Sequence, residues 1–244
     1  DIVNRVVRAL NGQETENRVI SLQTGFGGGK THTLISLYHI AKHGKNLLEY
    51  PSCAKLFQDA SAPKFDDAKV AVFTQDTTDV AQGRKTMDGL QIYTLWGEIA
   101  YQLGGKEAYE VIRQNDEARI APAGSVFRPI IESAGTSLIL IDELAAYCVN
   151  ASAQKVGDSN LFAQTNNFMQ TLTEIVSRVP QCVLIATLPS SATEVASSEI
   201  GQEVLDALQN RIVRISTSVK PVDDKEIYEV VRRRLFENII DQNV

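Results

Sequence analysis

A glycine-rich stretch, GFGGGKTH over residues 25–32, constrains the fold of this chain more than any other feature. It directly follows an apolar run of strand character, residues 19–24, and it opens a helical pattern that extends over residues 33–42. Glycines in such a turn let backbone N–H groups converge on phosphate oxygens at the start of a helix. Strand, glycine-rich turn, Lys-Thr pair and helix in this order predict a phosphate-binding loop for a nucleoside triphosphate.

This loop predicts both a nucleotide and a magnesium ion as ligands. Lys30 would place a mobile positive charge near the outer phosphates of ATP, and the hydroxyl of Thr31 would ligate Mg²⁺. The usual pattern, G-x-x-x-x-G-K-[ST], has Gly where this chain has Thr24, and Gly25 comes one residue late. The residues expected to bind the nucleotide are Gly25, Phe26, Gly27, Gly28, Gly29, Lys30, Thr31 and His32.

A second motif lies at the end of a continuously apolar run, residues 137–141, which is followed by Asp142 and Glu143. Such a run is typical of a strand buried on both faces of a parallel sheet. In a phosphate-loop domain, Asp142 would hold Mg²⁺ with Thr31, mainly through water, because Mg²⁺ keeps several of its own waters. Glu143 would orient or deprotonate the water that attacks the phosphate. The alternative is a strand that merely ends in two solvated acids.

Two further residues are candidates on weaker grounds. Thr187, at the end of the apolar run 182–187, would contact the γ-phosphate or the attacking water. The alternative is that its hydroxyl only satisfies a backbone group at a strand end. Ser190 is the reserve candidate for the same role. Arg211 precedes an apolar run, residues 212–216, and would neutralise transition-state charge on a neighbouring subunit's nucleotide. The alternative for Arg211 is a surface arginine at a helix end.

Strand-like runs separated by helical patterns predict an α/β fold with a parallel sheet and helices on both faces. The expected strands are residues 19–24, 69–74, 137–142, 182–187 and 212–216, preceded by a helix over residues 2–10. A single domain of 244 residues is expected: an N-terminal helix (1–18), a phosphate-loop core (19–217) and a segment with a closing helix (218–244). Because the sequence begins with Asp1, we expect it to be part of a longer protein.

Composition and charge limit the class of partner and the compartment. The net charge of −6 argues against broad, non-specific nucleic-acid binding by this domain alone. No apolar run approaches the roughly 20 residues that cross a membrane, and no secretory pattern is present, so we expect a cytoplasmic protein. Three widely spaced cysteines, Cys53, Cys148 and Cys182, indicate buried thiols in a reducing compartment. His39 and His43 have the spacing of paired metal ligands, but a helix-face role is favoured.

The combined motifs resemble the AAA+ branch of phosphate-loop ATPases. More narrowly, the segments LQTGFGGGKTHTLISLYH, DGLQIYTLWGEIAYQLGG, LILIDELAAY and PVDDKEIYEVVRRRLF resemble the domain-of-unknown-function 499 family of large bacterial and archaeal proteins, often linked to anti-phage islands. The resemblance implies a three-layer αβα sandwich with five parallel strands in the order 5-1-4-3-2. It carries over Lys30, Thr31, Asp142 and Glu143 by motif, and Thr187 and Arg211 only by position in the fold. It also implies a small helical lid after the fifth strand, which we expect to be largely missing from residues 218–244.

The function expected from these residues is Mg²⁺-dependent ATP hydrolysis by a module of a larger protein, and the resemblance places that protein in anti-phage defence. An alternative is a nucleotide-gated assembly switch with slow or no hydrolysis. A second alternative is a DNA translocase motor, in which DNA would be contacted by other parts of the full-length protein. Expected partners are the nucleotide and either further copies of the chain or other defence proteins, with no membrane contact.

Overall fold

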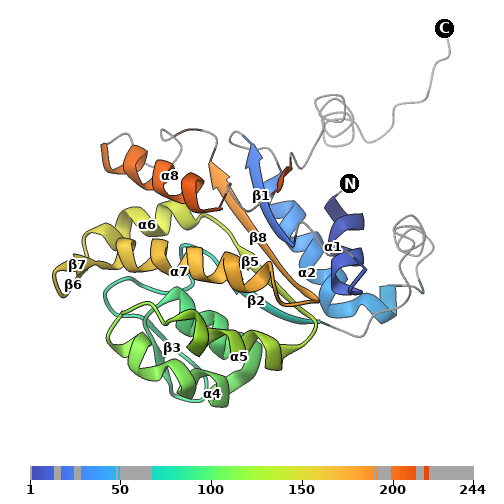
Figure 1. Ribbon diagram of the computed structural model, residues 1–244, viewed down its shortest axis with the longest axis horizontal. Helices are drawn as coiled ribbons and strands as arrows, with labels where there is room; N and C mark the ends of the chain where they lie inside the picture. The colour runs from blue at the N-terminus through green and yellow to red at the C-terminus, as the bar shows by residue number, and fades with distance from the viewer. Residues whose placement is uncertain are drawn as a thin grey trace, which may run out of the picture.

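The computed structural model describes residues 2–13, 18–24, 29–47, 49, 68–189, 191, 199–212 and 217–219. Within these, a parallel sheet forms the centre of the molecule (Figure 1). Its strands lie side by side in the order β2 (Lys69–Phe73), β5 (Ser137–Ile141), β8 (Cys182–Pro189), β1 (Val19–Thr24) and β9 (Thr217–Val219). The predicted α/β class, with a parallel sheet between helices, is confirmed.

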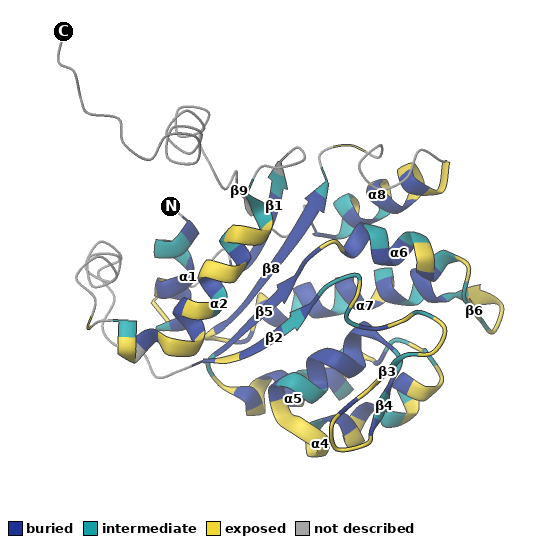
Figure 2. Cartoon of the chain, turned by 180° about the vertical axis from the view of Figure 1, so that it is seen from behind, coloured by how far each residue is buried: buried dark blue, intermediate teal, exposed yellow. Residues whose placement is uncertain are grey.

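Helices cover both faces of the sheet. The described helices are α1 (Ile2–Leu10), α2 (Lys30–Leu47), α4 (Leu95–Glu117), α5 (Gly124–Ala134), α6 (Leu144–Ser152), α7 (Leu161–Val176) and α8 (Glu199–Ile212). Alternate residues along each strand face opposite sides, so each strand contributes to two separate cores. In β5, Leu138 and Leu140 pack with α1 and α2, whereas Ile139 and Ile141 pack with α4 to α8. Figure 2 shows the resulting central layer of buried strands.

Every residue of β5 is buried, as its uninterrupted apolar sequence predicts for a strand with a neighbour on each side and helices on both faces. Its register with β8 places Ser137 opposite Cys182 and Ile141 opposite Ala186. On its other side Phe73 of β2 lies opposite Ile141. The polar residues that follow β5 therefore emerge at the edge of the sheet where neighbouring strands also end.

The structure corrects several predicted boundaries. The fifth strand is not at residues 212–216: Ile212 is the last residue of α8, residues 213–216 lie outside the described part, and the observed strand β9 is Thr217–Val219. Residues 75–90 and 150–160 are polar, which predicts surface loops. Each of these regions instead contributes to a short antiparallel hairpin: β3 (Arg84–Lys85) pairs with β4 (Gln91–Ile92), and β6 (Lys155–Val156) pairs with β7 (Ser159–Asn160). The closing helix expected after Asp223 lies outside the described residues.

Two helices begin earlier than their sequence patterns predict: the predicted ranges are residues 166–178 for α7 and 126–133 for α5. Helix α7 starts at Leu161, because the side chain of Asn160 accepts a hydrogen bond from the N–H of Ala163 (2.9 Å) and caps it. Helix α5 starts at Gly124, so Pro129 lies in its second turn, whereas a start at residue 126 would place Pro129 in the first turn. Within α4 the backbone at Gly105 is not helical (φ 66°, ψ −156°), so residues 95–117 form two helical segments. This agrees with the sequence pattern, which predicts one helix over residues 93–103 and another over residues 106–115, after Gly104 and Gly105.

Candidate nucleotide site

Three of the predicted site residues meet at one carboxylate. The hydroxyl of Thr31 donates a hydrogen bond to Oδ2 of Asp142 (2.8 Å), and the hydroxyl of Thr187 donates one to Oδ1 (2.6 Å). Thr31 is the second residue of α2, Asp142 directly follows β5, and Thr187 lies in β8. Residues separated by 111 and 45 positions in the sequence are thus brought together.

The order of the strands explains this meeting. Because the sheet is parallel, the carboxyl ends of β1, β5 and β8 lie at the same edge, where ligands bind in open α/β sheets. β8 lies between β1 and β5, so the start of α2, which follows β1, faces Asp142 across the end of β8. The N–H of Asp142 donates to the carbonyl of Phe73 (2.8 Å), which holds the residue beside β2 as well.

The Asp142 carboxylate is mostly removed from solvent. Asp142 is 7% exposed and Thr187 2%, whereas Thr31 is exposed. A buried carboxylate is costly unless hydrogen bonds compensate for its lost hydration, and two hydroxyl donors supply that here. A carboxylate can accept about four hydrogen bonds, so this group retains acceptor capacity.

Glu143 occupies an unusual backbone conformation next to this carboxylate. It is the residue before α6, it has φ 55° and ψ 32°, and its side chain is exposed. Its N–H donates to the Thr187 hydroxyl (3.1 Å). A left-handed conformation costs a non-glycine residue roughly 1–2 kcal/mol. Such outliers concentrate at functional sites, where the surrounding structure holds them in place.

Thr187 therefore links the two acidic residues: it donates to Asp142 and accepts from the backbone of Glu143. The bond from the Glu143 N–H is the one expected if the Thr187 hydroxyl only satisfies a backbone group at a strand end. The bond to Asp142 is an additional contact to a proposed magnesium ligand. Ser190, the reserve candidate, lies outside the described residues.

The phosphate loop is described only at its end. Gly29 has φ 78°, a conformation that favours glycine, and its carbonyl accepts hydrogen bonds from the N–H and the hydroxyl of Thr33 (both 3.0 Å). Lys30 is the first residue of α2 and is half-buried, and His32 is exposed on the same helix. The expected nucleotide ligands Gly25, Phe26, Gly27 and Gly28 lie outside the described residues.

Arg211 does not join the carboxylate cluster within this chain. It lies in the last turn of α8, and its Nη1 donates to the side-chain carbonyl of Gln170 on α7. This contact within one subunit was not expected, and no local sequence pattern links two residues 41 positions apart. Whether Arg211 serves a neighbouring subunit stays a prediction.

The oxygen atoms gathered at Asp142 are suitable ligands for a magnesium ion that binds together with a nucleotide. Mg²⁺ prefers oxygen ligands and is commonly held by one or two protein groups plus phosphate oxygens and water. The Thr31 hydroxyl and the Asp142 carboxylate are two such oxygens, already in contact at the start of a helix. The N-terminus of α2 adds N–H groups and a positive partial charge that favour phosphate.

Other types of site find no support among the described residues. No three His, Cys, Asp or Glu side chains in the described ranges are grouped so as to hold a metal ion. The rings of His39 and His43, both in α2, stack on each other (centroids 5.9 Å apart), in agreement with a helix-face role. Cys148 and Cys182 are free and buried, as expected, whereas Cys53 lies outside the described part. No described helix has the length and apolar character needed to cross a bilayer.

Comparison with known proteins gives one match. A family model described as the DUF499 N-terminal domain matches residues 1–220, which is most of the chain. No curated protein and no solved structure matches. The matched range includes Lys30, Thr31, Asp142, Glu143, Thr187 and Arg211.

Proposed function

The chain belongs to the DUF499 N-terminal domain family, and we propose that this domain binds ATP with Mg²⁺ and hydrolyses it as the ATPase module of a larger protein. The observation that carries the proposal is the pair of hydrogen bonds that join Thr31 and Thr187 to Asp142. A Lys-Thr pair at a helix start and an aspartate after a buried strand of the same parallel sheet are the two elements that phosphate-loop enzymes require.

Each residue has a distinct role in this proposal. Lys30 neutralises charge on the β- and γ-phosphates, with the N–H groups at the start of α2. Thr31 and Asp142 hold Mg²⁺, which neutralises charge that develops on the phosphate oxygens. Glu143 accepts a proton from, or orients, the water that attacks the γ-phosphorus, and its exposed side chain is free to approach that water.

Thr187 positions Asp142 and Glu143. Its bonds to the Asp142 carboxylate and the Glu143 N–H fix the carboxylate and the backbone of the proposed general base relative to each other. Catalysis by phosphoryl-transfer enzymes rests largely on such positioning. Loss of the Thr187 hydroxyl is therefore expected to lower turnover more than nucleotide affinity.

The strand order supports an AAA+-like arrangement within this proposal. Numbered along the chain as five sheet strands, the order β2-β5-β8-β1-β9 corresponds to 5-1-4-3-2 read from the other edge. In that arrangement Arg211, near the end of α8, would act on the nucleotide of an adjacent copy, after leaving Gln170. The proposed larger context, anti-phage defence in bacteria or archaea, rests on the family alone.

Two matched pairs of variants test the proposal in the 244-residue chain and in the full-length protein. Lys30→Ala should weaken binding of a fluorescent ATP analogue at least about tenfold, because charge-assisted hydrogen bonds contribute roughly 1.5–3 kcal/mol. Lys42→Ala, in the same helix and exposed, is the control and should bind as wild type.

Glu143→Gln should keep nucleotide binding and lose ATP turnover, whereas the control Glu132→Gln, exposed on α5, should hydrolyse ATP as wild type does. Wild-type turnover by Glu143→Gln would refute the catalytic assignment.

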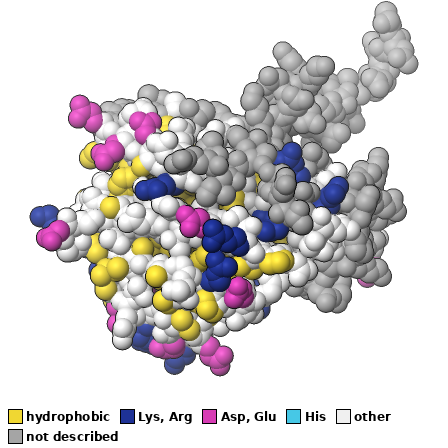
Figure 3. Space-filling model, in the orientation of Figure 1, with side chains coloured by type: hydrophobic (Ala, Val, Ile, Leu, Met, Phe, Trp, Pro, Cys, Tyr) yellow, Lys and Arg dark blue, Asp and Glu magenta, His cyan; other side chains and the backbone are white. Residues whose placement is uncertain are grey.

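The same variants separate this proposal from the alternatives. In a nucleotide-gated switch, defence activity would survive Glu143→Gln but not Lys30→Ala. A DNA translocase would show an ATPase rate that DNA stimulates. On the face seen in Figure 3, the described Lys and Arg side chains lie near Asp and Glu side chains, so both signs of charge are present there.

A further inference from the structure

An open pocket of about 600 Å³ lies at the carboxyl end of α4, away from the residues proposed to bind nucleotide. One wall is formed by the β3–β4 hairpin and the segments on either side of it, and the other by the end of α4. Its lining includes Ala81, Leu90, Gln91, Tyr93, Arg113 and Arg119. This volume lies within the range of small-molecule binding sites.

Arg119 occupies a position at which glycine is the usual residue. It lies just after α4 and has φ 55°. The N–H of Ile120 donates to the backbone carbonyl of Asn115 (2.9 Å), and the N–H of Arg119 donates to the backbone carbonyl of Asp116 (3.0 Å). This is the Schellman pattern of a helix end, in which glycine commonly takes the left-handed position. An arginine in this conformation is strained by roughly 1–2 kcal/mol, and residues strained in this way concentrate at functional sites.

The guanidinium of Arg119 is held in place without a carboxylate partner. It lies 4.7 Å from the centroid of the Tyr93 ring, and its Nη2 donates to the carbonyl of Ala81 (2.7 Å). No ion pair joins Arg119 to any acidic group in the described ranges. Nη2 is thus used to hold the pocket wall, and Nε is buried without a hydrogen-bond partner among the described residues, so Nη1 and the second hydrogen of Nη2 are the donors left for a ligand.

The charged groups around the pocket cancel: Arg113 and Arg119 carry two positive charges, and Glu110 and Glu117 two negative charges. Arg113 pairs with both oxygens of Glu110 and lies 3.6 Å from Glu117, which also lines the pocket. Among the described residues, Arg119 is therefore the lining cation without a carboxylate partner. A singly charged carboxylate suits this site better than a phosphate dianion, which the lining carboxylate of Glu117 would repel more strongly.

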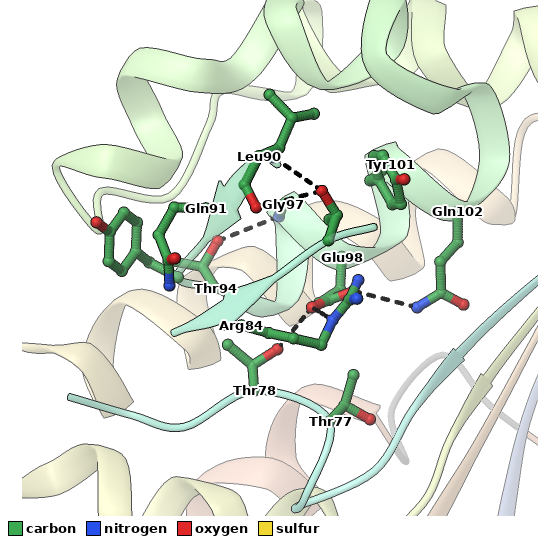
Figure 4. A network of polar contacts seen from close by, with 12 residues as sticks. Thr77, Thr78, Arg84, Leu90, Gln91, Thr94, Gly97, Glu98, Tyr101 and Gln102 are labelled. Carbon is green, nitrogen blue, oxygen red and sulfur yellow. Dashed lines mark hydrogen bonds and ion pairs between the residues drawn. The ribbon is translucent and has the colours of Figure 1, made fainter. Parts of the chain in front are cut away.

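The wall opposite α4 is rigidly attached to the helix. Arg84 of the hairpin donates from Nε and Nη2 to the two oxygens of the buried Glu98 (both 2.6 Å), and Thr78 and Gln102 donate to the same carboxylate (Figure 4). The Tyr109 hydroxyl also donates to the carbonyl of Gln91 (2.8 Å). A pocket with pre-ordered walls loses less entropy when a ligand binds.

From these observations we propose that this pocket binds the free carboxylate of a peptide C-terminus or of a small organic acid, with Arg119 as the carboxylate ligand. The rings and methyl groups of Tyr93, Leu90 and Ala81 would contact the apolar part of the ligand. The site is independent of ATP binding, so it can be tested whatever the outcome of the nucleotide experiments.

The test is a titration of the 244-residue chain followed by NMR of isotope-labelled Ala and Leu methyl groups, which include Ala81 and Leu90. The probes are butyrate, N-acetyl-Ala-Leu with a free carboxylate, and the same dipeptide as its C-terminal amide. The free acid should bind at least about fivefold more tightly than the amide, because only the acid makes charge-assisted hydrogen bonds. Tighter binding of the dipeptide than of butyrate would identify a peptide end, and the reverse order a small acid.

Arg119→Gly and Arg119→Asn remove the guanidinium and suit the positive φ, so both should fold with an unchanged or higher melting temperature and lose the preference for acid over amide. Arg128→Gln, on α5 and not part of the pocket lining, is the control. The proposal is overturned if acid and amide bind equally, if either Arg119 variant keeps the preference, or if inorganic phosphate binds more tightly than the acids.

Discussion

Replacing Arg84 with Met should destabilise the fold by about 3 kcal/mol, because it leaves the Glu98 carboxylate buried without its cation. Glu98 has no exposed surface, and Arg84 provides two of its four hydrogen bonds. Removing one partner of a buried ion pair commonly costs roughly 3–5 kcal/mol. Since the Arg84 side chain is itself 34% exposed, water can reach part of the vacated space, which favours the lower end of that range.

The effect should be largely reversed when Glu98 is also neutralised. Gln at position 98 keeps an acceptor for Thr78 and carries no charge, so the double variant Arg84→Met/Glu98→Gln should lie within about 1 kcal/mol of wild type. Urea denaturation followed by circular dichroism measures both free energies of unfolding. The matched control is Arg113→Met, which breaks an exposed pair with Glu110 on the same helix and should leave the urea midpoint unchanged.

This reasoning would be refuted by either of two results: a loss below about 1 kcal/mol for Arg84→Met, or a double variant as unstable as the sum of the two single variants. The first would mean that solvent compensates for the lost arginine. The second would mean that Arg84 and Glu98 stabilise the fold independently of each other.

Two further predictions concern buried titratable groups. Burial raises the pKa of Asp116, so the protonated carboxyl group is favoured in the folded state. The contribution of Asp116 to the free energy of unfolding is therefore complete at acidic pH and is lost as the pH rises through the folded-state pKa. In urea titrations, the stability advantage of wild type over Asp116→Asn should shrink as the pH rises from about 4 to 7. An advantage that grows with pH would contradict this sign. Burial also raises the pKa of Cys182 to about 11 and raises that of Cys148, so mass spectrometry after thiol labelling should find both unmodified until the chain unfolds. Labelling in the native state would show that these thiols are accessible.

The sequence was sufficient to predict the parts of the fold that have strong local signals. The apolar run before Asp142 is typical of a buried strand, and it forms β5. The pattern after the glycine-rich turn predicts a helix over residues 33–42, and the observed helix α2 is longer, Lys30–Leu47. Their meeting at Asp142 follows from parallel strands ending at one edge. The backbone conformation of Glu143 has no such signal, because it depends on the Thr187 hydroxyl that holds its N–H.

The parts that were missed depend on pairings between distant residues. Strands of two residues, such as β3 and β4, have no periodicity that a sequence can display. Glu98 resembles a solvated helix residue in the sequence and becomes a buried ion-pair partner only because Arg84 folds back onto it. Likewise the start of α7 depends on one cap, Asn160, within a polar stretch that was expected to be a loop.

The central claim is that Thr31 and Asp142 form a magnesium-dependent nucleotide site, and calorimetric titration with ATP, with and without Mg²⁺, tests it most directly. Wild type should bind ATP at least about tenfold more tightly when Mg²⁺ is present, and Asp142→Asn should lose that dependence while it remains folded. Absence of ATP binding at millimolar nucleotide, or an ATP affinity that Mg²⁺ does not change in wild type, would contradict the account.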